Sequence, residues 1–215
     1  MSKHSLWLAL IGMVSLQTAA SAQTGFVSMV DHLHLAAPNP EQAVAWYQKH
    51  FDGKPTKEGL DRLMFGETRM IIQKNDKPEP SSGSVLDHIG FSVPDLDATL
   101  KAFQADGVKV VQPARDVPGL FKLAFVEDPW GTRIEIGQDP EKLGLHHVHL
   151  RSPDPAGILA WYVDNFGGTV SKLKGRRNGI NYGGVWMLTL QGAATPSAGH
   201  SIDHMGMRPQ NVDNA

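Results

Sequence analysis

The chain contains no cysteine among its 215 residues. This absence excludes disulfide bonds and a lipid anchor attached through cysteine, so stability must come from packing, with a bound metal as a further source. The sequence also lacks an excess of positive charge, since it has 20 lysines and arginines and 22 aspartates and glutamates. A net charge of -2 gives no general attraction to nucleic acid or to an anionic membrane. Partners must therefore be inferred from a specific site.

The N-terminal segment has no apolar run as long as a membrane-spanning helix, which needs about 20 residues. Its apolar stretch covers 11 residues, Leu6 to Leu16, preceded by a lysine and followed by Ala-Ser-Ala. This order is typical of a secretory signal peptide over residues 1–22, cleaved after Ala22. An uncleaved anchor is the alternative, and the short stretch argues against it. The sequence predicts a secreted or periplasmic protein that is free of the membrane after cleavage.

A six-residue pattern with histidine in third place occurs four times. The segments read VDHLHL, LDHIGF, LHHVHL and IDHMGM, and their histidines are His32, His88, His147 and His204. Successive histidines are 56, 59 and 57 residues apart. This near-constant spacing indicates an internal structural repeat.

Each of the first three histidine segments is followed by a helix pattern and then by short strand patterns. Asn39 and Asp95 are predicted helix N-caps, and Gly53 and Gly107 are predicted to end the same helices. The sequence therefore predicts an α+β fold of repeated βαβββ units in curled mixed sheets, with an incomplete fourth unit.

The predicted organisation has three parts. They are a signal peptide at 1–22, a domain of units one and two at 23–140, and the third unit with a truncated fourth at 141–215.

The alternation of side chains along a strand predicts the face on which each histidine lies, because residues two apart share a face. Leu33, Ile89 and Ile134 fall on the apolar faces, which we expect to form the core. His32, His88 and Glu135 fall on the opposite faces. These faces are expected to line the concave side of a curled sheet, where polar groups from two units can meet.

The repeated unit, the opening Asp-His strand and the segment EDPWGTRIEI resemble the vicinal oxygen chelate superfamily. That superfamily includes glyoxalase I, extradiol dioxygenases, fosfomycin-resistance enzymes, methylmalonyl-CoA epimerase and bleomycin-resistance proteins. The resemblance covers residues 29 to about 207. It implies a cup built from two paired units, with a divalent metal held by first and last strands.

The resemblance assigns metal-ligand positions to His32, His88, Glu135 and Gln73. Two imidazoles and a carboxylate also form the facial triad that leaves coordination positions open for substrate or oxygen. The implied cofactor is a divalent ion, with Zn, Ni, Fe, Mn and Co as alternatives. Glu135 is the predicted catalytic residue as well as a ligand, because it could move a proton.

Other polar residues near these positions have two interpretations each. His34 and His149 could touch substrate or lie on a solvated rim, and His146 is expected to be structural. Arg69, Arg133 and Arg151 could receive an acidic substrate, but ordinary surface arginines are the preferred interpretation.

The second half of the chain departs from the superfamily pattern. His147 and His204 match first-strand ligands, yet the fourth unit stops at Ala215 without a helix or a closing strand. Either the sequence is a fragment, or the second cup is degenerate and serves packing or oligomerisation. Because extradiol dioxygenases hold iron in their second pair of units, this pattern disfavours the dioxygenase interpretation. Residues 29–137 are therefore predicted to form the primary site alone.

Two classes of function remain. The first is glyoxalase-type lyase or isomerase chemistry on a small oxygenated substrate, catalysed with a metal. The alternatives are a metal-free binding or sequestering protein of the bleomycin-resistance kind, and an extradiol-dioxygenase-like oxygenase. The expected partners are a small-molecule substrate and, as one possibility, a second copy in a homodimer.

Overall fold

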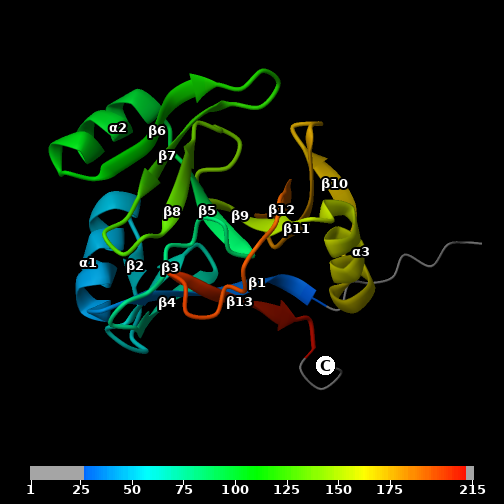
Figure 1. The fold of residues 1–215 in the computed structure, drawn as a ribbon, viewed down its shortest axis with the longest axis horizontal. Helices are drawn as coiled ribbons and strands as arrows, with labels where there is room; N and C mark the ends of the chain where they lie inside the picture. The colour runs from blue at the N-terminus through cyan, green and yellow to red at the C-terminus, as the bar shows by residue number, and fades with distance from the viewer. Residues whose placement is uncertain (1–26, 212–215) are drawn as a thin grey trace, which may run out of the picture.

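The computed structural model describes residues 27–211. Within them, 13 strands form two mixed sheets, and three helices accompany the sheets. The predicted signal peptide lies outside the described residues. No helix within 27–211 is long and apolar enough to cross a bilayer. The predicted α+β class with curled mixed sheets is confirmed (Figure 1).

The predicted βαβββ order occurs three times. Unit one consists of β1 (Val27–Ala37), α1 (Pro40–Phe51), β2 (Lys54–Pro55), β3 (Arg62–Phe65) and β4 (Thr68–Lys74). Unit two consists of β5 (Leu86–Ser92), α2 (Leu96–Ala105), β6 (Lys109–Asp116), β7 (Lys122–Glu127) and β8 (Arg133–Gly137). Unit three consists of β9 (Gly144–Ser152), α3 (Pro155–Phe166), β10 (Val170–Leu173), β11 (Arg177–Tyr182) and β12 (Val185–Gln191). The last strand, β13 (Ile202–Pro209), corresponds to the first strand of a unit.

The helices begin where the sequence predicts them to begin. Asn39 caps α1 by accepting a hydrogen bond from the Gln42 amide, and Asp95 caps α2 by accepting one from the Ala98 amide. These side chains satisfy amide groups that have no partner within the helix. α1 ends one residue before the left-handed Asp52, so its last turn closes just ahead of the predicted stop at Gly53.

The units pair through their first strands, and this pairing differs from the prediction. The five-stranded sheet has the order β13-β1-β4-β3-β2, and the eight-stranded sheet has the order β10-β11-β12-β9-β5-β8-β7-β6. β5 therefore pairs with β9, antiparallel, while β1 pairs with β13 (Figure 1). Unit two shares a continuous sheet with unit three, and unit one shares a sheet with β13.

The expectation that units one and two form one cup is therefore wrong. A strand has only two hydrogen-bonding edges. The edges of β1 are occupied by β4 and β13, and those of β5 are occupied by β8 and β9. No edge of β1 remains for β5, so His32 and His88 lie in different sheets.

The predicted core faces are confirmed. Leu33, Ile89 and Ile134 are at most 1% exposed and belong to one hydrophobic cluster that runs through both sheets. Because side chains alternate along a strand, burying these residues turns the neighbouring histidines and Glu135 to the opposite faces. The units are also joined by a buried hydrogen bond of 2.8 Å from the Tyr47 hydroxyl on α1 to Asp128.

Candidate metal centre

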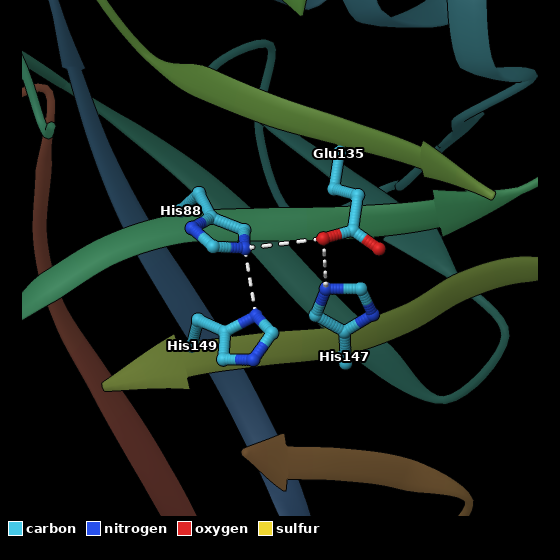
Figure 2. A group of neighbouring side chains, drawn as sticks. All are labelled: His88, Glu135, His147 and His149. Carbon is cyan, nitrogen blue, oxygen red and sulfur yellow. Dashed lines mark hydrogen bonds and ion pairs between the residues drawn. The ribbon is translucent and has the colours of Figure 1, made fainter. Parts of the chain in front are cut away.

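Three neighbouring strands of the eight-stranded sheet bring four polar side chains together. β5 lies between β8 and β9 in this sheet. His88 is on β5, Glu135 is on β8, and His147 and His149 are on β9. The register sets His88 opposite His149, and it sets Gly90 beside both Glu135 and His147. Figure 2 shows the four side chains pointing toward a common centre.

The potential ligand atoms of this cluster all lie within 4.8 Å of one another. Glu135 Oε2 is 3.5 Å from His88 Nε2 and 3.8 Å from His147 Nε2. His149 Nδ1 is 2.6 Å from His88 Nε2 (Figure 2). Nitrogen and carboxylate oxygen atoms at these separations could converge on one divalent ion after small side-chain movements.

Asp87 orients the His88 ring from behind. Its Oδ1 atom accepts a hydrogen bond of 2.7 Å from His88 Nδ1, which turns the Nε2 atom of the ring toward the cluster. The other carboxylate oxygen accepts bonds of 2.8 Å from Arg151 Nε and from the Gly83 amide. Burial opposes ionisation of Asp87, but these hydrogen bonds hold its pKa well below the usual range. A carboxylate behind a histidine is the usual support of a metal ligand.

His147 is supported in a different way. Its Nδ1 atom is 2.9 Å from Nδ1 of His146, whose Nε2 is 3.3 Å from Asp139. The Asp139 carboxylate also pairs with Lys174 Nζ at 2.9 Å. Nε2 of His147 is buried and has no hydrogen-bond partner within residues 27–211. This orphaned nitrogen faces Glu135, as a metal-ligating nitrogen would.

Gly90 makes room for the His147 ring. A Cβ atom at this position would lie 2.0 Å from Cε1 of His147, which is closer than real contacts allow. The imidazole therefore packs directly over the backbone of β5. The glycine in the LDHIGF segment is a requirement of the cluster.

The protonation states suit metal binding. Burial would raise the pKa of Glu135, but the adjacent His147 and His88 outweigh it and lower the pKa. Burial holds the pKa values of His147 and His149 well below the ordinary value. The pKa of His88 is raised, because Asp87 and Glu135 outweigh its burial. The cluster therefore presents a carboxylate and, at His147 and His149, neutral imidazoles, which are the forms that bind metals.

A cavity of about 270 Å³ opens over the cluster. Its wall is partly apolar, with leucines and phenylalanines beside the four polar groups. Four arginines also line it: Arg115, Arg133, Arg151 and Arg177. Arg151 is neutralised by Asp87, but in the described part of the chain the other three form no ion pair. The cavity therefore has an excess of positive charge.

The structure separates the predicted ligands into two groups. His88 and Glu135 lie together as expected. His32 lies in the five-stranded sheet with His34 and His204, and Gln73 lies beside them near the end of β4. Burial, then His204 and His32, lower the pKa of His34, and a hydrogen bond with Gln73 opposes them.

Two members of the centre are not predicted from the sequence. The sequence places His147 outside the primary site and leaves His149 as a substrate contact or a rim residue. Both are at least nine-tenths buried and belong to the cluster. Arg133 and Arg151 line the cavity, contrary to the preferred interpretation as ordinary surface residues, whereas Arg69 pairs with Asp31 at 2.8 Å.

Comparisons with known proteins agree with this architecture. The Glyoxalase/Bleomycin resistance protein/Dioxygenase superfamily matches residues 29–136. Glyoxalase I from Zea mays has a similar fold, with a TM-score of 0.66 at 17% identity, covering 83% of this chain and 73% of that chain. A point mutant of that enzyme gives a TM-score of 0.68 at 17% identity, covering 83% of this chain and 74% of that chain.

A smaller solved structure covers about half of this chain. It is the fosfomycin resistance protein FosX from Listeria monocytogenes, with a TM-score of 0.45 at 17% identity, covering 53% of this chain and 92% of that chain. No curated protein sequence gives a significant match.

Proposed function

The chain belongs to the Glyoxalase/Bleomycin resistance protein/Dioxygenase superfamily, and on that premise we propose that it is a metal-dependent enzyme. Its metal centre would be the cluster of three histidines and Glu135. The observation that carries the proposal is His147 Nε2, which is buried, faces Glu135 and has no hydrogen-bond partner within residues 27–211. An unsatisfied buried nitrogen costs about 1–3 kcal/mol, and ligation of an ion would remove that cost.

The donor set suits a first-row divalent ion. Imidazole nitrogen favours Zn, Ni, Fe and Co, and the carboxylate extends the range to Mn. Asp87 and the His146 ring hold two of the histidines in place, as supports of ligands do. An ion bound there would act as a Lewis acid toward oxygen atoms of a substrate in the cavity.

The residues of the centre support glyoxalase-type lyase or isomerase chemistry on a small oxygenated substrate. Such reactions begin with the removal of a proton from a carbon next to a carbonyl group. Glu135 is the candidate base, because its pKa is lowered and its carboxylate is ionised at neutral pH. In Figure 2 one carboxylate oxygen, Oε2, faces His88 and His147, while the other is turned away from them. That second oxygen is the atom that we expect to accept the proton.

The arginines narrow the substrate class to anions. Arg177 lies close enough to His149 to help lower its pKa, after burial and His88. Arg133 lies over the Phe125 ring, and its buried Nε atom has no partner in the described chain. Guanidinium groups pair with carboxylate or phosphate geometry through two parallel hydrogen bonds. We therefore expect a substrate that carries an anionic group beside its reacting oxygens.

Replacing Arg177 with alanine should raise KM for an anionic substrate by about tenfold or more, because a charge-assisted hydrogen bond is worth about 1.5–3 kcal/mol. The value of kcat should change less, since the arginine would hold the anionic group of the substrate and would not move the proton. Arg176→Ala is the matched control, as it removes the same charge from an adjacent residue that does not line the cavity. Equal effects of the two changes on KM would contradict the anion site.

The reaction class can be tested before the substrate is known. The chain, loaded with each of Zn, Ni, Co, Mn and Fe, is incubated in D2O with small hydroxy and oxo acids. Proton NMR then reports exchange at the carbon beside the carbonyl. Metal-dependent exchange that is lost in Glu135→Gln supports the proposal, and the absence of exchange with every acid and metal contradicts it.

The same preparations separate the two alternatives. Oxygen uptake with Fe(II) and a vicinal diol would favour the oxygenase. Four protein donors fill more of an ion's coordination sphere than the three of a facial triad, which leaves less room for dioxygen and disfavours that chemistry. Tight binding of small molecules with no metal dependence would favour the sequestering protein. The convergent His-Glu cluster disfavours this class, because a metal-free binder has no use for it.

We also propose that the protein is exported, on the strength of the N-terminal sequence pattern. The mature form in the extracytoplasmic fraction should begin at Gln23, directly after the Ala20-Ser21-Ala22 motif. Mass spectrometry of the N-terminal peptide checks this result. Detection of intact residues 1–22 in that fraction would rule out cleavage.

A further inference from the structure

Two neighbouring histidines on β9 share a hydrogen bond beside the metal centre. His146 Nδ1 lies 2.9 Å from His147 Nδ1, and both side chains are buried. A neutral imidazole carries its proton on one nitrogen, so one of these two atoms donates and the other accepts. The direction of the bond decides whether Nε2 of His147, the atom that faces Glu135, carries a proton or a lone pair (Figure 2).

Asp139 fixes the direction of this bond. Its Oδ2 atom lies 3.3 Å from Nε2 of His146. Burial would raise the pKa of this carboxyl group, but hydrogen bonds from Lys174 and the Glu141 amide outweigh it and lower the pKa. The ionised carboxylate can only accept, so Nε2 of His146 must donate. Burial lowers the pKa of His146, so the ring has one proton at neutral pH and its Nδ1 atom is left as the acceptor.

The proton of His147 follows from that of His146. Burial holds the pKa of His147 well below the ordinary value, so this ring also has a single proton. Because His146 Nδ1 accepts, His147 Nδ1 must donate, and Nε2 of His147 is left with a lone pair. Glu135 Oε2, 3.8 Å from this nitrogen, is an acceptor too, which explains why the nitrogen has no hydrogen-bond partner within residues 27–211. A lone pair that faces a carboxylate is the arrangement that a cation between them would stabilise.

We propose that Asp139 and His146 are positioning residues, which together set the tautomer of His147 and so keep its Nε2 atom free to bind an ion. The consequence for the ion rests on the proposed function. The tautomer itself does not, because it follows from hydrogen bonds within the chain. Asp139 lies in the segment between β8 and β9, so the linker of units two and three takes part in the centre.

The two oxygens of Asp139 are held in different roles. Oδ1 is 2.9 Å from Lys174 Nζ and accepts a hydrogen bond of 3.1 Å from the Glu141 amide, whereas Oδ2 faces His146. Ser92 fixes the backbone, because its hydroxyl donates to the Asp139 carbonyl and accepts from the Asp139 amide. Oδ1 therefore lies among donors, and Oδ2 is left for the histidine ring.

Asp139→Asn tests the relay, because it keeps the shape of the side chain and reverses one of these roles. The amide oxygen should stay among the donors at the Oδ1 position, which turns the NH2 group toward Nε2 of His146. The proton of His146 should then move to Nδ1, and the proton of His147 to Nε2. Mn(II) affinity should fall about 10–100-fold, the usual effect of losing the support behind a metal ligand.

Long-range proton–nitrogen NMR of the metal-free, isotope-labelled chain reports which ring nitrogen carries the proton, and comparison with His147→Gln assigns the signals. We expect His147 to carry its proton on Nδ1 in the unaltered chain and on Nε2 in Asp139→Asn. Lys174→Met is the control, since it removes a charge beside Asp139 but keeps the carboxylate, and it should leave the proton on Nδ1. Calorimetric titration of Mn(II) into the same variants measures the affinity.

The unaltered chain tests the first step without any substitution. A proton on Nε2 of His147 in that chain would overturn the inference, and so would a proton that stays on Nδ1 in Asp139→Asn. A shift to Nε2 in Lys174→Met as well would also overturn it, because loss of charge would then suffice. A shift in Asp139→Asn alone, with unchanged Mn affinity, would support the relay and contradict His147 as a ligand, and with it the proposed metal centre.

Discussion

Glu135→Gln should reduce turnover by about 10²–10⁴-fold, the usual contribution of a general base, and should weaken Mn(II) binding more than Zn(II) binding. The reason is that glutamine keeps the size of the side chain but removes the only anionic donor of the cluster. Three imidazoles remain, and they hold Zn far better than Mn. Calorimetric titration of each metal into the apo chain measures the two affinities.

The fold should survive this substitution. Glu135 is 5% exposed, and replacing a buried carboxylate by a neutral amide of the same shape removes a desolvation cost. Far-UV circular dichroism and urea unfolding should therefore match the unaltered chain. Glu127→Gln is the control, because Glu127 lies on the adjacent strand β7 and pairs with Lys109 at the surface. Unchanged Mn affinity in Glu135→Gln would remove the centre and favour the metal-free binding protein.

The positions of the ligands on their strands could be predicted from the sequence. Period-two alternation correctly assigns Leu33, Ile89 and Ile134 to the core, and this assignment directs His88 and Glu135 away from it. Helix caps at Asn39 and Asp95 are equally local, because each depends on a side chain and an amide three residues apart. Strand faces and helix caps depend on residues that are close in sequence, so each can be predicted from a single short segment.

The pairing of units could not be predicted in the same way. Each unit begins with a similar strand, and the spacings of 56 and 59 residues are equally compatible with pairing units one and two or units two and three. The choice depends on which strand occupies the free edge of β5, and this is decided by packing of whole units. As a result, His32 was combined with His88, whereas the structure combines His88 with His147.

One feature of the sequence limits which units can pair through their first strands. Two residues after the repeated histidine, units one and three have a second histidine, while unit two and β13 have Gly90 and Gly206. In both sheets a glycine strand pairs with a histidine strand, because the glycine leaves room for the opposing ring. This rule excludes pairing of units one and three. It does not separate the observed pairs from units one and two, so it would have been insufficient alone.

Gly90→Ala should disable the metal centre of three histidines and Glu135 without substituting any of its ligands. The new methyl group would lie 2.0 Å from the His147 ring, which must swing away from Glu135 to relieve the overlap. We expect Mn affinity to fall at least tenfold, and overpacking to lower the free energy of unfolding by about 1–3 kcal/mol. Titration of Mn(II) and urea unfolding measure the two effects separately.

Gly206→Ala is the matched control for this change, since its methyl group would displace His32 in the other sheet by a similar overlap. It should leave Mn binding and catalysis intact. A chain with Gly90→Ala that retains full Mn affinity would show that His147 is not a ligand. The orphaned His147 Nε2 atom would then need another explanation, because no hydrogen bond within residues 27–211 satisfies it.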